Sequence, residues 1–76
     1  MQTLEIKLPS IDVIKQFVAA ANSIDSDIDL GTGRIIVDAK SILGVLSYAS
    51  NKKDKILLTV HSEDSTALNC LQPFMA

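Results

Sequence analysis

Aromatic residues, cysteine and clustered positive charge are all scarce in this chain. With no tryptophan, two phenylalanines and one tyrosine, the interior should be aliphatic and no cofactor site is expected. The single cysteine excludes an intramolecular disulfide and a cysteine zinc site. The net charge is −2, and no basic run is longer than Lys52-Lys53. Neither nucleic acid nor a membrane surface is therefore expected as a direct partner.

Long hydrophobic runs are missing as well. A helix that spans a bilayer needs roughly 18 consecutive apolar residues, and no segment comes near that length. The N-terminus has no charged stretch followed by an apolar core, so we expect a cytoplasmic protein. The length suits one domain over residues 1–76, which should bury only about 60% of the surface of its unfolded chain.

Cys70 carries a reactive type of side chain, but its position favours a packing role. It lies at helical spacing among Ala67, Leu68, Leu71 and Phe74. Free cysteine is among the residue types most often buried. We therefore expect Cys70 to lie in the core rather than to act as a reactive thiol.

Alternation of apolar and polar residues predicts four strands. They cover Thr3–Leu8, Asp27–Leu30, Arg34–Asp38 and Lys55–His61. Gly31-Thr32-Gly33 should be a tight turn between the second and third strands, because glycine readily adopts the positive φ that such turns need.

The inward face of the third predicted strand is ambiguous, because Ile35, Ile36 and Val37 are consecutive. Our preferred inward set is Ile35, Val37 and Ala39. Ile36 would then lie on the other face of the sheet.

Apolar stripes at helical spacing predict three helices. The first runs from Ile11 to about Asn22, with Ser10 as its N-cap and Asp12 in its first turn. The others run from Ser41 to about Ser50 and from Thr66 to about Gln72. Four strands and three amphipathic helices in this order indicate a two-layer α+β domain with the helices on one face of a mainly antiparallel sheet.

The start of the second helix is the stretch with most functional content. Ser41 reads as an N-cap, and a phosphate on it would lie where unpaired amides and the helix dipole favour negative charge, beside Lys40. Ile42, Leu43, Val45 and Leu46 make this helix too apolar to hide every side chain. Gly44 costs about 1 kcal/mol relative to alanine, which a close backbone approach or access for a partner could explain.

The chain resembles the HPr family, the histidine-containing phosphocarriers of the bacterial phosphoenolpyruvate-dependent sugar phosphotransferase system. Ala39-Lys40-Ser41-Ile42-Leu43-Gly44-Val45-Leu46-Ser47 is similar to the regulatory-serine segment of that family, and Ala67-Leu68-Asn69-Cys70-Leu71 to its last helix. The resemblance implies an open-faced β-sandwich with sheet order 1-4-2-3. It also implies a protein that is not an enzyme.

The family's phosphoacceptor site is where the chain departs from the resemblance. Counting back from Ser41 without gaps puts Ser10 at the histidine position and Asp12 at the arginine position. A serine hydroxyl needs an activating base and forms a stable ester, whereas histidine forms a high-energy phosphoramidate. Asp12 would repel phosphate where arginine neutralises it. We therefore expect the sugar-transfer relay to be lost.

The resemblance implies that an HPr kinase phosphorylates Ser41 and that the product binds a transcriptional regulator of carbon catabolite repression or other phosphotransferase-system proteins. Lys40, Ile42, Leu43 and Leu46 would form the partner-binding surface around it. The protein would be a monomer or a weak homodimer.

Two other hypotheses remain open. Ser41 could be only an N-cap, which would stabilise the protein by about 1 kcal/mol. The fold would then be reused for protein binding or assembly, for example by pairing of two copies through the surface around Ile42, Leu43 and Leu46. The chain could also still accept phosphate from Enzyme I. His61, the only histidine, falls on the solvent face of its strand and has no second ligand at metal-binding spacing, so we expect neither a phosphoacceptor nor a metal ligand there.

Overall fold

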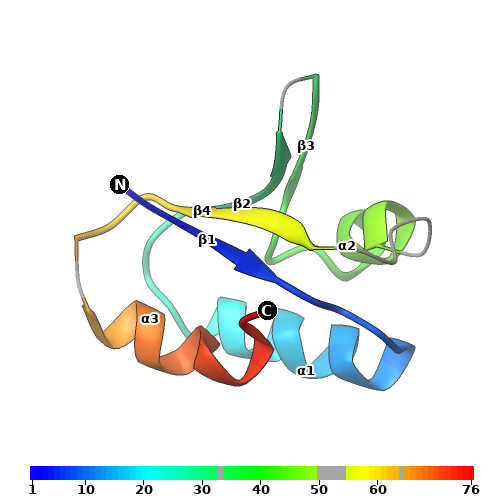
Figure 1. The fold of residues 1–76 in the computed structure, drawn as a ribbon, viewed down its shortest axis with the longest axis horizontal. Helices are drawn as coiled ribbons and strands as arrows, with labels where there is room; N and C mark the ends of the chain where they lie inside the picture. The colour runs from blue at the N-terminus through cyan, green and yellow to red at the C-terminus, as the bar shows by residue number, and fades with distance from the viewer. Residues whose placement is uncertain (33, 50–54, 64) are drawn as a thin grey trace.

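An antiparallel sheet of four strands organises the structure, a computed structural model that describes residues 1–32, 34–49, 55–63 and 65–76. The strand order is β1-β4-β2-β3, as the resemblance implied. Helices α1 and α3 lie side by side beneath β1 and β4, and α2 lies beside the base of the β2-β3 hairpin (Figure 1). The elements are β1 (Gln2–Ile6), α1 (Ile11–Asn22), β2 (Ile28–Thr32), β3 (Ile35–Asp38), α2 (Ile42–Ala49), β4 (Ile56–Val60), α3 (Ser65–Leu71) and η1 (Gln72–Phe74).

The core lies between the sheet and the helices and is almost wholly aliphatic, as the composition predicts. Strand β4 contributes every second residue to it. From α1, Phe17 is fully buried and meets Phe74 edge-on, with ring centroids 5.5 Å apart at 85°. The side chains that are completely or almost completely buried include Phe17, Ile6, Ile28, Leu30, Leu58, Leu71, Val45 and Val60.

Helix α1 has the predicted bounds and the predicted cap. Ser10 is in extended conformation, and its side chain accepts a hydrogen bond of 3.2 Å from the backbone N–H of Val13. Helix α3 begins one residue before its predicted start and continues into the short 3₁₀ helix η1, which contains Pro73. The predicted turn at 51–54 and residue 50 lie outside the described residues.

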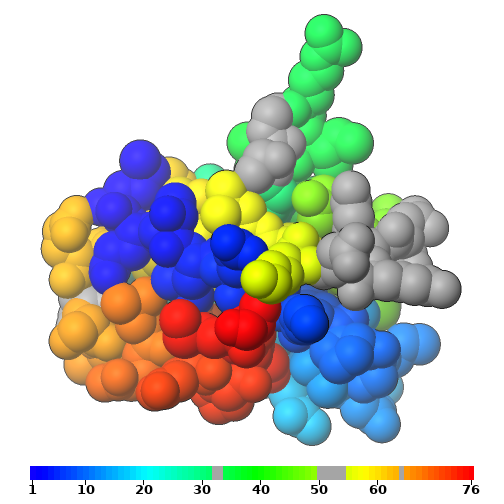
Figure 2. Space-filling model, viewed as in Figure 1, coloured from blue at the N-terminus to red at the C-terminus, as the bar shows by residue number. Residues whose placement is uncertain are grey.

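The β2-β3 hairpin differs from the prediction at its tip. Gly31 and Thr32 belong to β2, so the strand runs two residues past Leu30, and Gly33 lies outside the described residues. Gly31 does adopt the expected positive φ, at 111°. The extra length carries the hairpin away from the body of the molecule, as Figure 2 shows for the green segment at the top.

The preferred inward set on β3 is partly wrong. Val37 pairs with Leu30, packs against the core and is half-buried, and Ala39 is fully buried. Ile35 shares their face by alternation but is 62% exposed. Because the hairpin extends beyond the helices, the inward direction has nothing to pack against at Ile35.

Cys70 is exposed, which overturns the packing role expected for it. Helix α3 buries Ala67 and Leu71, four residues apart. Leu68 is partly buried beside this narrow stripe and also packs against the core, whereas Asn69 and Cys70 are exposed.

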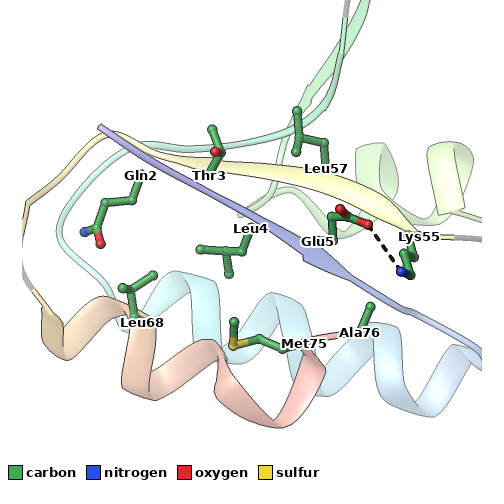
Figure 3. A pocket seen from close by; sticks show the side chains of 9 residues that line it. All are labelled: Gln2, Thr3, Leu4, Glu5, Lys55, Leu57, Leu68, Met75 and Ala76. Atoms are coloured by element: carbon green, nitrogen blue, oxygen red, sulfur yellow. Dashed lines mark ion pairs between the residues drawn. The ribbon is translucent and has the colours of Figure 1, made fainter.

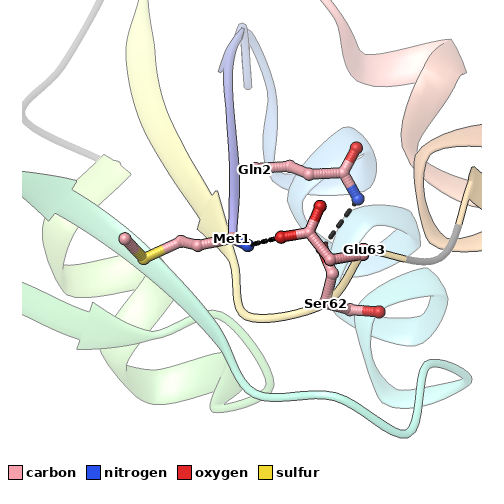
Figure 4. Close-up of polar contacts among 4 residues, drawn as sticks. All are labelled: Met1, Gln2, Ser62 and Glu63. Atoms are coloured by element: carbon pink, nitrogen blue, oxygen red, sulfur yellow. Dashed lines mark hydrogen bonds and ion pairs between the residues drawn. The ribbon is translucent and has the colours of Figure 1, made fainter.

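Both chain ends are tied to neighbouring elements. The N-terminal amine of Met1 pairs with Glu63, and the Gln2 side chain donates a 2.7 Å hydrogen bond to the Ser62 carbonyl (Figure 4). At the other end, the Ala76 N–H donates to the Glu5 carbonyl at 3.0 Å. The last residues therefore pair with part of the outer edge of β1.

A shallow hollow of about 480 Å³ lies along that edge, between β1 and the C-terminal segment (Figure 3). Leu4, Leu68 and Met75 give it an apolar floor, and an exposed Glu5–Lys55 ion pair of 3.8 Å lies at its rim. Among the residues described, no helix has the length and apolar character required to cross a membrane.

Candidate functional site

Ser41 lies immediately before α2 and caps it. Its Oγ accepts a 3.3 Å hydrogen bond from the N–H of Gly44, and its carbonyl accepts from the N–H of Val45 at 2.9 Å. Its own N–H donates to the Asp38 carbonyl at 3.0 Å. The residue is exposed, so the hydroxyl that caps the helix is also accessible from solvent. These contacts confirm the predicted cap.

The first turns of α2 present apolar side chains to solvent. Leu43 is 77% exposed and Ile42 38% exposed, while Leu46 is half-buried against the core. Val45 and Ala49 pack the helix against the core, and their side chains are fully or almost fully buried. We call Ile42, Leu43 and Leu46 the α2 surface. The α2 surface directly follows Ser41 in the chain. Its exposure agrees with the prediction that this helix has more apolar side chains than the core can bury.

Lys40 is engaged in a way that sequence reasoning missed. Its Nζ donates a 2.5 Å hydrogen bond to the carbonyl of Ile24, just past the end of α1. A cation there is favourable, because the C-terminal end of a helix carries partial negative charge. The carbonyl of Lys40 in turn accepts from Nδ2 of Asn22 at 3.0 Å, and its N–H donates to Asp38. Lys40 thus joins the start of α2 to the end of α1.

Ser10 and Ser41 lie at opposite ends of α1. Ser10 caps its start, whereas Ser41 follows Lys40, which is bonded to its last residue, Asn22. A 12-residue helix is about 18 Å long. The two positions therefore do not form one site. Ser10 and Asp12 are both exposed, with the 60% exposed Ile11 between them.

His61 has a partner that the sequence did not reveal. Its Nε2 lies 2.8 Å from Oδ2 of Asp29, and both side chains are 40% exposed. Asp27 and Asp38 line the same hollow of about 370 Å³. As predicted, His61 lies on the face of the sheet opposite the buried side chains of β4. The strand register brings these residues together, and a pattern within a single strand gives no signal of that.

No metal site is formed by the residues that the structure describes, because no group of three or more His, Cys, Asp or Glu side chains is suitably placed.

A close backbone approach does not explain the glycine at position 44. A Cβ built on it would lie 3.5 Å from Ser41 Oγ and from Val37 Cβ, which are ordinary contacts. We therefore expect Gly44→Ala to raise the free energy of unfolding by up to about 1 kcal/mol, the helix propensity difference. Chemical denaturation measures the change. A loss of stability would mean that α2 needs the glycine for packing.

The sequence profile described as "PTS HPr component phosphorylation site" matches residues 12–76. The chain therefore belongs to the HPr family of the phosphotransferase system. The matched segment starts at Asp12 and so does not include Ser10. A search of curated proteins found no match.

Two solved structures are similar over nearly the whole chain. HPr-C-His from Thermoanaerobacter tengcongensis is 22% identical with a TM-score of 0.78, over 96% of this chain and 89% of that one, and supports the fold alone. The phosphocarrier protein HPr from Bacillus anthracis str. Ames is 26% identical with a TM-score of 0.74, over 99% and 94%.

Proposed function

We propose that this HPr-family protein is a regulatory phosphoserine module of the sugar phosphotransferase system, acting in the cytoplasm. Ser41 is the phosphate acceptor, and Ser10 and Asp12 stand in place of a histidine phosphotransfer pair. The protein is a substrate of a kinase and not itself an enzyme. Its signal is read by a partner, such as a transcriptional regulator of catabolite repression or another phosphotransferase-system protein.

The exposed hydroxyl of Ser41 at the N-terminus of α2 is the observation that carries this proposal. When the γ-phosphoryl group of ATP passes to Oγ, the hydroxyl proton is lost and ADP leaves. The new phosphate oxygens can then accept hydrogen bonds from the free amides of the first turn, where the helix dipole favours negative charge. Modification at this position is therefore compatible with the fold.

The surroundings of Ser41 suit a binding site for a partner protein, in which phosphorylation would add negative charge. Ile42 and Leu43 place exposed apolar surface next to the acceptor. Lys40 directly precedes Ser41 in the chain and is bonded to Ile24 and Asn22, and its ammonium can exchange the Ile24 carbonyl for a phosphate oxygen. A partner would read the apolar surface and the added charge together.

The test is to incubate the protein with an HPr kinase and ATP and to map any phosphate by mass spectrometry. We expect one phosphate, on Ser41. The matched control is Ser41→Asn, because asparagine caps helices about as well as serine but has no hydroxyl to phosphorylate. This variant should keep wild-type stability and take up no phosphate.

Two outcomes would contradict the proposal. One is an unmodified Ser41 under conditions in which the kinase labels a known substrate. The other is label spread over several serines, because a dedicated site on one helix terminus predicts a single acceptor. In either case Ser41 is not a dedicated phosphate acceptor.

A further inference from the structure

Strand β3 is an edge strand, and the outward side of its backbone is open at Ile36 and is bonded at Asp38, whose carbonyl accepts from the N–H of Ser41. Within the described part of the chain it pairs with β2 alone, and the sheet order places it at the end opposite β1. The β1 edge is partly paired by the C-terminal residues. Exposed edges of this kind readily pair with a further strand.

The pairing register of β3 with β2 shows which groups of β3 face outward. The N–H of Ala39 donates to the carbonyl of Ile28, so Ala39 points its backbone toward β2. In an antiparallel ladder this direction alternates along the strand, so Val37 and Ile35 also point toward β2. The N–H and C=O groups of Ile36 and Asp38 therefore point away from it, and the outward carbonyl of Asp38 accepts from the N–H of Ser41. Arg34 directly precedes the strand.

The side chains of this strand add apolar surface to the open edge. Ile36 is 55% exposed and Ile35 62% exposed. They lie on opposite faces of the hairpin, which stands out from the molecule in Figure 2. An edge strand that is apolar on both faces is the kind that soluble proteins otherwise protect.

We infer that β3 is a homodimerisation edge, which pairs antiparallel with β3 of a second copy about a two-fold axis at Ile36. In this register the outward groups of Ile36 bond to those of Ile36 in the second copy. Arg34 lies opposite Asp38 of the second copy, and Asp38 opposite its Arg34. Ile35 lies opposite Val37 twice. The contact is self-complementary, as a two-fold interface must be.

Charge and hydrogen-bond direction both select this register. If the register shifts by one residue, outward-pointing backbone groups of one copy lie opposite inward-pointing groups of the other and cannot bond to them. A shift of two places Ile36 opposite a charged residue, either Arg34 or Asp38. Only the register centred on Ile36 matches apolar with apolar and opposite charges with each other, which is the favourable cross-strand arrangement.

The acidic hollow supports the same partner. Asp38 shares its hollow with Asp27, Asp29 and His61, so Arg34 of the second copy would approach a surface rich in carboxylates. Arg34 is exposed and has no ion-pair partner within the described residues. Its guanidinium is therefore available for a contact between molecules.

Charge exchange between two variants tests the pairing. Arg34→Asp opposes two aspartates, and Asp38→Arg opposes two arginines, so each variant alone should dimerise at least about tenfold more weakly than the wild type. An equimolar mixture should form a mixed dimer in which both opposite-charge pairs are restored. In this dimer the two aspartates of the first variant lie opposite the two arginines of the second. Sedimentation velocity over a concentration series measures the dimer fraction in all four samples.

Three further measurements keep the result unambiguous. Lys15→Asp reverses a charge on the exposed side of α1 and should leave dimerisation unchanged. Thermal unfolding of each variant at low concentration shows that it is folded, which matters for Asp38→Arg because Asp38 accepts from Lys40. Amide exchange on the wild type should show the N–H of Ile36 becoming protected as the concentration rises.

A wild type that stays monomeric throughout the concentration series would overturn the inference. So would a dimer that neither variant weakens, or one that the mixture does not restore, since both results place the contact elsewhere, such as on the α2 surface. The result does not depend on phosphate at Ser41, so it stands or falls separately from the proposed function.

Discussion

Replacing Phe17 by alanine is expected to lower the free energy of unfolding by about 3–5 kcal/mol. Phe17 is completely buried and forms an edge-on ring pair with Phe74. Truncation removes its apolar surface and leaves a cavity that the surrounding strands cannot close. Because small domains are stable by only about 5–15 kcal/mol, the variant should lose much of its stability. Urea denaturation followed by circular dichroism measures the loss.

Lys15→Ala is the matched control, since Lys15 is exposed on the same helix and should change stability by no more than about 0.5 kcal/mol. A double-mutant cycle with Phe74→Leu isolates the ring pair, for which a coupling of about 0.5–1.5 kcal/mol is expected. A loss below about 1 kcal/mol for Phe17→Ala would mean that the helix layer is not packed on the sheet as described.

Gly31→Ala is expected to destabilise the hairpin by about 1–3 kcal/mol or more. Gly31 has a φ of 111°, which side chains rarely adopt, and a Cβ there would lie 2.3 Å from the carbonyl oxygen of Ile35. That oxygen belongs to the partner strand and cannot move without breaking the ladder. Denaturation reports the total loss, and amide exchange should locate it in β2 and β3.

Gly44→Ala provides the comparison, because the same chemical change there meets only ordinary contacts and should stabilise. Opposite signs at the two glycines are therefore predicted. If Gly31→Ala were as stable as the wild type, the positive φ and the close approach to Ile35 would both be incorrect.

Local patterns are sufficient to predict most of the fold. Ser10 followed by apolar residues at helical spacing gave α1 with its cap and both bounds, and alternation gave β4 within one residue at each end. These features depend on neighbours in sequence, which is what periodicity and capping rules describe. The strand order followed from the family resemblance and not from any one segment.

Predictions that required knowledge of distant neighbours were less successful. Ile35 has the alternation of an inward residue, but its exposure depends on how far the helices extend beneath the hairpin. Cys70 has helical spacing with core residues, yet α3 is too short to bury more than Ala67 and Leu71. For Ile35 the pattern gave the face correctly but not whether anything covers it, whereas for Cys70 the buried position that it predicted was wrong.

In the candidate site, too, features that depend on the local sequence were predicted, and contacts between distant residues were not. The cap at Ser41 and the exposed Ile42 and Leu43 follow from the local sequence, and the structure confirms them. The bonds from Lys40 to Ile24 and Asn22, and the contact of His61 with Asp29, join residues 16 to 32 positions apart. Such pairs are created by packing and register, which the sequence pattern does not encode locally.

The central claim is that this HPr-family chain takes phosphate on a serine from ATP and not on a histidine from phosphoenolpyruvate. Intact-mass spectrometry after separate incubation with HPr kinase and ATP, and with Enzyme I and phosphoenolpyruvate, tests it directly. The account predicts one acid-stable phosphate from the first system, located on Ser41, and none from the second. An acid-labile phosphate from phosphoenolpyruvate, necessarily on His61 if it is a phosphohistidine, would contradict it.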